Sequence, residues 1–233
     1  MTGVTLEDLQ TQIGYQFRNP QLLREALTHS SYAQETSAPA QDNEKLEFLG
    51  DAVLNFIVSV RLADVFPDYE EGKLSRARAC LVAAEHLARA AGPLRLGDYL
   101  RLGRGEEKTG GRCKNNLQVD ALEALIAALY RDGGLDAARN FIERFVLPAD
   151  LTSCADELFA IDFKSALQEY LQAAGAGPAS YRVAGESGPE HQKTFTVEVI
   201  AGDNGMARGS GGSKKAAEQQ AARNLLESLG RKP

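Results

Sequence analysis

The sequence has no long hydrophobic run. No apolar stretch reaches the roughly 18 residues expected of a membrane-spanning helix, and the N-terminal MTGVTLEDLQTQIGYQF has neither a basic start nor an apolar signal segment. We therefore predict no membrane span and no secretory signal, and we expect a cytoplasmic protein.

Cysteine is scarce. Cys80, Cys113 and Cys154 are odd in number, widely spaced and without a C-x-x-C pair, so the sequence predicts neither a disulfide framework nor a zinc site. His29 and His86 each lack a second His or Cys at ligand spacing. We expect neither histidine to bind a metal, and we expect a structural role for His29.

The sequence also has no overall excess of positive charge, and its net charge is −6. Residues 1–160 hold 17 basic against 24 acidic residues, whereas residues 161–233 hold 9 against 8. Between these parts, LPADLTSCADELFA (147–160) loses the helical apolar period, as a linker does. We predict a first domain over 1–152, a linker over 153–160 and a second domain over 161–230.

The two parts also differ in their predicted secondary structure. The first has helical periods only, and the second has a helix over 162–173, three alternating segments with glycine turns and a helix over 214–229. The fold class is thus α+β and multidomain, an all-α domain followed by an α-β-β-β-α domain. The helices expected in the first domain cover 5–12, 20–28, 43–65, 73–91, 94–97, 114–132 and 134–146.

Three carboxylates mark one side of the otherwise apolar segment DNEKLEFLGDAVLNFIVSV (42–60). On a helix, Glu44, Glu47 and Asp51 fall within roughly 60° of each other, opposite an apolar face. Because apolar residues flank this stripe, we expect a buried helix whose carboxylate side is poorly solvated. The residues expected on the apolar face are Leu46, Leu49, Val53, Phe56, Ile57 and Val60.

A second acidic pair lies in NNLQVDALEALIAALY (115–130). Asp120 and Glu123 share a helix face with Ala124 and Ala127, and such small residues let another helix approach closely. The partner we expect is the helix that carries Glu47 and Asp51. Four converging carboxylates are tolerable only with shared protons or bound hard cations, and oxygen ligands favour Mg²⁺ or Mn²⁺. Phosphoryl chemistry is a common use of such a site.

A single acid pair on a helix is ordinarily a solvated surface feature, but the order of several motifs is more specific. NEKLEFLGDAVL (43–54) resembles the signature segment of ribonuclease III, and VDALEALIAALY (119–130) resembles its second acidic motif. LTHSSY (27–32) and EGKLSRARACLV (71–82) fit the same family in order and spacing. The C-terminal segments DFKSALQEYLQ, GPEHQKTFTVEV and GSKKAAEQQAARNLL resemble the parts of a double-stranded-RNA-binding domain.

This resemblance implies an endonuclease domain over 1–152 and an RNA-binding domain over 161–230. It implies that Glu47, Asp51, Asp120 and Glu123 hold Mg²⁺ (Mn²⁺ can substitute), that Asp51 and Glu123 are catalytic, and that Glu44 and Glu71 are auxiliary acids. Double-stranded RNA would be hydrolysed to 5′-phosphate and 3′-hydroxyl ends, in rRNA, mRNA and small RNA processing. No organic cofactor is expected.

Duplex RNA offers minor-groove 2′-hydroxyls and intervening phosphates. The residues predicted to contact them are Gln168, Glu169, His191, Lys214 and Lys215. A homodimer would match the two-fold symmetry of the duplex, and the resemblance implies that Phe48 inserts into the partner chain.

The sequence departs from the family pattern at Gln118 and Val119, where Leu-Ala is common, and at Lys45, where Arg is common. Gln118 points about 160° away from Asp120, so it should affect packing and not the metal. Lys45 keeps the charge but not the guanidinium fork that a bidentate contact needs.

Two other function classes remain open at this point. One is an RNA-binding scaffold without catalysis, against which the presence of all four acids argues. The other is a phosphohydrolase of small substrates, which would leave residues 161–233 without a role.

Overall fold

The computed structural model describes residues 4–36, 41–155, 163–189 and 193–230. The chain divides into two compact units, Met1–Phe159 and Ala160–Pro233, which are described separately. Residues 156–160 of the expected linker lie outside the described residues. No helix among the described residues is long and apolar enough to cross a membrane.

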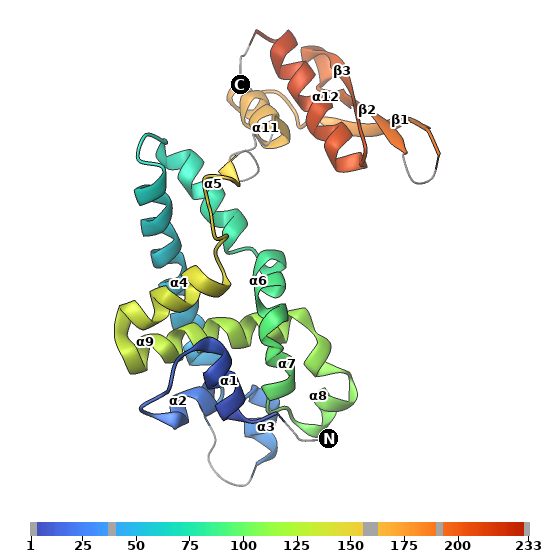
Figure 1. Ribbon diagram of the computed structural model, residues 1–233. Helices are drawn as coiled ribbons and strands as arrows, with labels where there is room; N and C mark the ends of the chain where they lie inside the picture. The colour runs from blue at the N-terminus through green and yellow to red at the C-terminus, as the bar shows by residue number, and fades with distance from the viewer. Residues whose placement is uncertain (1–3, 37–40, 156–162, 190–192, 231–233) are drawn as a thin grey trace. The chain divides into compact units, whose positions relative to one another are not determined.

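The described part of the first unit is helical (Figure 1), as expected for its fold class. Its elements are α1 (Leu6–Ile13), α2 (Pro20–Ala26), α3 (Ser30–Glu35), α4 (Glu44–Val65), α5 (Glu71–Leu81), α6 (Ala84–Ala91), the 3-10 turn η1 (Gly92–Leu94), α7 (Leu96–Tyr99), α8 (Arg104–Lys108), the 3-10 turn η2 (Gly111–Cys113) and α9 (Asn115–Phe145).

Helices α4 and α9 form the centre of this unit. Gly50 makes their close approach possible, because a Cβ added there would overlap the backbone carbonyl of Glu123. The alanines facing the contact, Ala124 and Ala127, are fully buried, as the sequence predicted. Farther along α9, Gly134 has φ 76°, which interrupts the helix where the sequence predicted a break between 132 and 134.

Three expectations for the first unit were wrong. The helix expected over 73–91 is divided into α5 and α6, because Ala83 between them is extended (φ −63°, ψ 142°). The two helices pack on different partners, α5 on α4 and α6 on α9. Phe56 is 53% exposed and does not join the buried face of α4. The carboxylate side of α4 is also more open than expected, because Glu44 and Asp51 are exposed and only Glu47 is half-buried.

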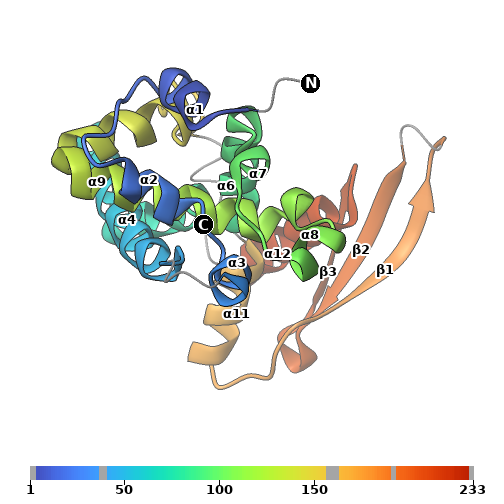
Figure 2. The same cartoon turned by 90° about the horizontal axis from the view of Figure 1, so that it is seen from below.

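The second unit is the expected α-β-β-β-α arrangement. It consists of α11 (Phe163–Ala173), β1 (Ser180–Ser187), β2 (Thr194–Ile200), β3 (Met206–Gly211) and α12 (Lys214–Ser228), with a 3-10 turn η4 (Gly202–Asn204) before β3. The strands pair antiparallel in the order β1-β2-β3, as Figure 2 shows. The core joins both helices to the sheet and includes Leu167, Leu171, Val199, Leu225 and Leu226.

One charged residue of this sheet is buried. Glu198 on β2 lies in register between Arg182 on β1 and Arg208 on β3. Arg182 Nε donates to Glu198 Oε2 (2.6 Å), and Arg208 Nε donates to Oε1 (2.9 Å). These hydrogen bonds, that of Arg182 first, lower the pKa of Glu198. Two guanidinium groups therefore satisfy this carboxylate completely within the chain.

Candidate active site

The first turns of α4 carry one set of acids. The Asn43 backbone N–H donates to Thr28 O (2.9 Å), which fixes the start of the helix against the segment before α3. Glu44 and Glu47 follow in the first turn, where the positive end of the helix dipole favours carboxylates. Asp51 is one turn farther and accepts a hydrogen bond from Asn55 Nδ2 (2.8 Å).

The second set of acids comes from α9. Gly50 lies against the Glu123 backbone, so α4 and α9 are in close contact at this level. Glu47 and Asp51 lie within one turn of Gly50, and Asp120 lies one turn before Glu123. The charges of Glu47, Asp51 and Asp120 all act on Glu123, so these four acids, which the sequence selected, lie near one another; we call them the acid cluster.

Burial, and for two of them mutual repulsion, raises the pKa values of three carboxyl groups in the acid cluster. Burial, followed by the charges of Asp51, Glu47 and Asp120, raises the pKa of Glu123 to about 7. Burial and neighbouring carboxylates, Asp120 first, also raise the pKa of Glu47. Burial raises the pKa of Asp120, and the charge of His29 partly offsets this rise.

The described residues supply no lysine or arginine that forms an ion pair with the acid cluster. Nor do any three described His, Cys, Asp or Glu side chains converge as a ready-made metal site. The donors nevertheless fit a hard divalent cation, because all are carboxylate oxygens and their repulsion leaves negative charge uncompensated.

The two auxiliary acids lie in different places. Glu44 is on α4 beside the acid cluster, and its charge contributes to the raised pKa of Glu47. Glu71 begins α5, accepts a hydrogen bond from Ser75 Oγ (2.7 Å), and lines a cavity of about 410 Å³ with Ser59 and Leu62. Since Ser59 is eight residues beyond Asp51, about 12 Å along α4, Glu71 borders a distant part of this helix within one chain.

Comparisons with known proteins identify the family of this chain. A family model described as ribonuclease-III-like matches residues 19–150. A curated relative, Ribonuclease 3 of Solibacter usitatus, is 50% identical over 95% of this chain and 86% of its own length. Ribonuclease 3 of Geobacter sulfurreducens is 44% identical over 97% of this chain and 92% of its own length.

The chain belongs to the ribonuclease III family. It is therefore an endoribonuclease, a hydrolase whose substrate class is double-stranded RNA. Among solved structures, the nuclease domain of ribonuclease III from Campylobacter jejuni matches with a TM-score of 0.57 and 36% identity, covering 67% of this chain and all of that one.

The second unit supplies the RNA-binding half of this ribonuclease III. A model described as double-stranded RNA binding motif matches residues 163–229. Gln168 and Glu169 are exposed on α11, and Lys214 and Lys215 are exposed at the start of α12. Ser213 caps this helix by accepting from Ala216 N (3.1 Å). His191 lies outside the described residues.

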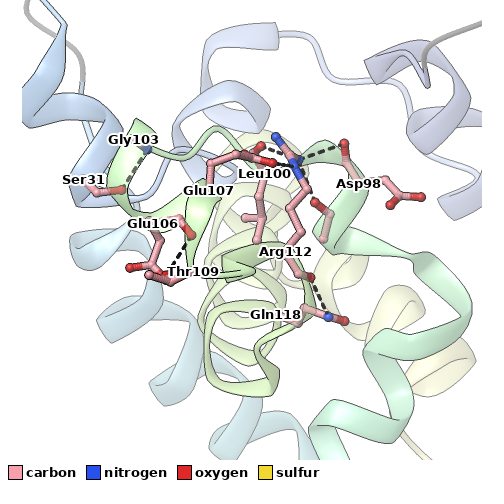
Figure 3. A network of polar contacts seen from close by, with 10 residues as sticks. Ser31, Asp98, Leu100, Gly103, Glu106, Glu107, Thr109, Arg112 and Gln118 are labelled. Atoms are coloured by element: carbon pink, nitrogen blue, oxygen red, sulfur yellow. Dashed lines mark hydrogen bonds and ion pairs between the residues drawn. The ribbon is translucent and has the colours of Figure 1, made fainter.

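A polar network before α9 was not predicted from the sequence (Figure 3). Arg112 Nη1 donates to the carbonyl oxygens of Gly97 (2.8 Å) and Leu100 (2.9 Å), and its Nε donates to Glu107 Oε1 (2.6 Å). Gln118 Nε2 donates to Arg112 O (2.9 Å). Gln118, where the sequence differs from the family pattern, therefore contributes to local packing, as the predicted direction of its side chain indicated. The network as a whole holds the segment that leads into α9.

Proposed function

We propose that this chain hydrolyses phosphodiester bonds of double-stranded RNA with Mg²⁺, or Mn²⁺ in its place, held by Glu47, Asp51, Asp120 and Glu123. The observation that carries the proposal is a cluster of four carboxylates without a cationic partner among the described residues, on the two helices that pack most closely. The chemistry that such an ion supplies is activation of water and neutralisation of charge on the leaving 3′-oxygen.

The protein's own part is to hold oxygen donors in place. The α4–α9 contact at Gly50 fixes the two acid pairs relative to each other. Glu123, whose pKa is about 7, gives up its proton when positive charge enters the site. We assign direct catalytic roles to Asp51 and Glu123 and auxiliary roles to Glu44 and Glu71, with products that carry 5′-phosphate and 3′-hydroxyl ends.

For the second unit, we propose that Lys214 and Lys215 contact phosphates. Both lysines are in the first turn of the 15-residue helix α12, where the helix dipole also attracts anions, and Lys214 Nζ lies 3.9 Å from Glu186 Oε1. Gln168, Glu169 and His191 would address 2′-hydroxyl groups in the two minor grooves on either side. Family membership further supports processing of rRNA, mRNA and small RNA duplexes in the cytoplasm.

A homodimer is the assembly that we propose. Phe48 is 81% exposed and Phe56 is 53% exposed, and with the exposed Ala52 they form an apolar stripe at i, i+4 and i+8 along α4. A second copy of this chain would bury the stripe around Phe48 by two-fold symmetry. The nuclease domain of the Campylobacter jejuni protein has a structurally flexible region involved in dimer formation, which supports this choice.

One cleavage assay tests the catalytic proposal. Purified full-length protein is incubated with long duplex RNA, single-stranded RNA or duplex DNA, with Mg²⁺ or with EDTA, and the product ends are mapped. We expect cutting of duplex RNA only, with Mg²⁺ only, and 5′-phosphate ends. Binding of duplex RNA without any cutting in Mg²⁺ would favour the scaffold alternative.

A matched pair of variants tests the RNA contacts. Replacing both Lys214 and Lys215 by alanine should weaken duplex binding and reduce the salt dependence of the binding constant by about one to two ion equivalents. Arg223→Ala, on the same helix but far from its N-terminus and hydrogen-bonded to Glu227 (2.8 Å), should leave both quantities nearly unchanged. Equal effects of the two replacements would contradict the assignment.

A further inference from the structure

His29 lies at the edge of the acid cluster. Its backbone N–H donates to Arg101 O (3.1 Å), and the preceding residue, Thr28, accepts from Asn43 N at the start of α4. His29 also lies near enough to Asp120 on α9 and Glu106 on α8 to lower the pKa of both carboxyl groups when its ring is protonated. His29 therefore lies where the start of α4, α8 and the Asp120 side of the cluster come together.

Hydrogen bonds fix the tautomer of this imidazole. The Ser31 backbone N–H can only donate, and it donates to His29 Nδ1 (3.3 Å). The Ser31 hydroxyl accepts from Gly103 N–H (2.9 Å), as Figure 3 shows, and because Nδ1 already accepts from Ser31 N–H, the hydroxyl donates its own proton to Nδ1 (2.8 Å). With Nδ1 accepting, the proton of the neutral ring is on Nε2.

The Nε2–H group is available to a ligand. None of the hydrogen bonds among the described residues uses Nε2 of His29, and the atom is not among the buried polar atoms that lack a partner. The ring is half-buried, so packing and the Ser31 contacts restrict its orientation. An Nε2–H group held in this orientation near Asp120 can donate a hydrogen bond to an anionic ligand.

We propose that His29 is a substrate-contacting residue, whose Nε2–H donates to a backbone phosphate oxygen of the RNA strand that occupies the acid cluster. The proposal rests on the proposed function, because that function is what brings a phosphodiester to this place. Ser31 is then a positioning residue, since it sets the tautomer and orientation of the ring and touches no substrate. Phosphate contacts of this kind fix the register of a nucleic acid on a protein.

Two substitutions at position 29 separate this role from a purely structural one. Asparagine keeps an acceptor near the place of Nδ1, so it preserves the cap of α3 and the bond from Ser31 N–H, but it has no donor that reaches the place of Nε2. Glutamine has a donor that reaches the place of Nε2 but no acceptor near the place of Nδ1. We expect His29→Asn to fold with an unchanged melting temperature and to lose roughly 10- to 100-fold in kcat/KM on duplex RNA, the range for one hydrogen bond to a charged group. We expect His29→Gln to stay within about threefold of the unsubstituted protein.

The opposite ranking, with asparagine active and glutamine impaired, would show that His29 only caps α3 and would overturn the proposal. Equal losses in both variants would overturn it as well. Failure of the unsubstituted protein to cut duplex RNA would instead refute the proposed function. Full activity of His29→Asn beside an active unsubstituted protein refutes only the role of His29.

A double-mutant cycle tests the part played by Ser31. Ser31→Ala should reduce cleavage several-fold in the His29 background, because the ring loses the hydroxyl that holds it. In the His29→Gln background the same change should have little further effect on cleavage, since glutamine has no Nδ1 to be held. Additive losses in the two backgrounds would contradict the positioning role.

Discussion

The two units of this chain differ in how they surround a glutamate, which is fully buried in the second unit and half-buried in the first. In the second unit, Glu198 lies between Arg182 and Arg208, and its pKa is lowered. In the first unit, Glu123 lies among carboxylates, and its pKa is raised to about 7. Glu198 is satisfied within the chain, whereas Glu123 lacks compensating charge among the described residues. A half-buried acid with a raised pKa and no compensating charge indicates a ligand from outside the chain.

The largest effect should follow from removing the charge of the uncompensated acid. Glu123→Gln should lower Mg²⁺-dependent cleavage of duplex RNA by about 10³-fold or more, because an oxygen donor and its charge leave the site. Duplex binding should persist, and the metal-free protein should melt at the same or a higher temperature because repulsion falls. Gel shift, cleavage and thermal unfolding on one preparation check these points; retained cleavage would make Glu123 an ordinary structural acid.

The next test moves the two acid pairs apart. Gly50→Ala places a Cβ on the Glu123 carbonyl, so α4 and α9 must separate. We expect a loss of about 3 kcal/mol in the free energy of unfolding, together with loss of cleavage. The measurement is urea unfolding of the first unit within the full chain.

The control for this test is Gly72→Ala in the first turn of α5, where an added Cβ comes no closer than 4.0 Å to Arg76 Nη1. It should be neutral or stabilise by up to about 1 kcal/mol. Similar results for the two glycines would show that the close approach at Gly50 does not determine the geometry of the site.

A smaller effect is expected from the compensated acid. Glu198→Gln keeps the shape but leaves Arg182 and Arg208 without their carboxylate, so the melting temperature of the second unit should fall by roughly 5 °C. Cleavage at saturating enzyme should be unchanged, because Glu198 belongs to the other unit. A fall in cleavage without a fall in melting temperature would remove the contrast between the two glutamates.

The sequence predicted the parts of this molecule that repeat a period. Helices α4 and α9, the interruption at Gly134 and the three strands all follow from apolar spacing and glycine positions. Helices α3 and α8 were missed because six and five residues are too few to display a period. These short helices are held by distant partners, as when Arg104 N donates to Glu35 Oε2 (2.9 Å).

The candidate site was predictable to a similar degree. Two acid pairs on apolar helices, next to small residues, indicated the four acids, and the resemblance to ribonuclease III implied their metal-binding role, which stays a prediction. The contact at Gly50, the Arg112 network and the His29–Ser31 pair depend on which backbone atoms meet across the fold, and no local pattern specifies them. A glycine in the middle of an apolar helix was the one available signal for the first of these.

The smallest predicted effect concerns pH, and its sign differs between the two glutamates. Without metal, the folded pKa of Glu123 is about 7 against an ordinary value of 4.5. Between these values the folded state retains a proton that the unfolded state has released, so the stability of the first unit should fall as pH rises from about 4.5 to 7. The raised pKa values of Glu47 and Asp120 act in the same direction.

The lowered pKa of Glu198 gives the second unit the opposite pH dependence. The stability that Glu198 contributes is complete above its ordinary pKa and is lost as pH falls below it.

Thermal unfolding in EDTA across this pH range should therefore show the melting temperature of the first unit declining by a few degrees. The decline should flatten in Glu123→Gln and remain in Glu198→Gln. Mg²⁺ should stabilise the first unit more at the upper end of the range than at the lower end, because protons compete with the cation for the same oxygens. An equal pH dependence in Glu123→Gln and the unsubstituted protein would mean that the acid cluster is solvated well enough to ionise freely, and Glu123 would then no longer differ from a surface acid.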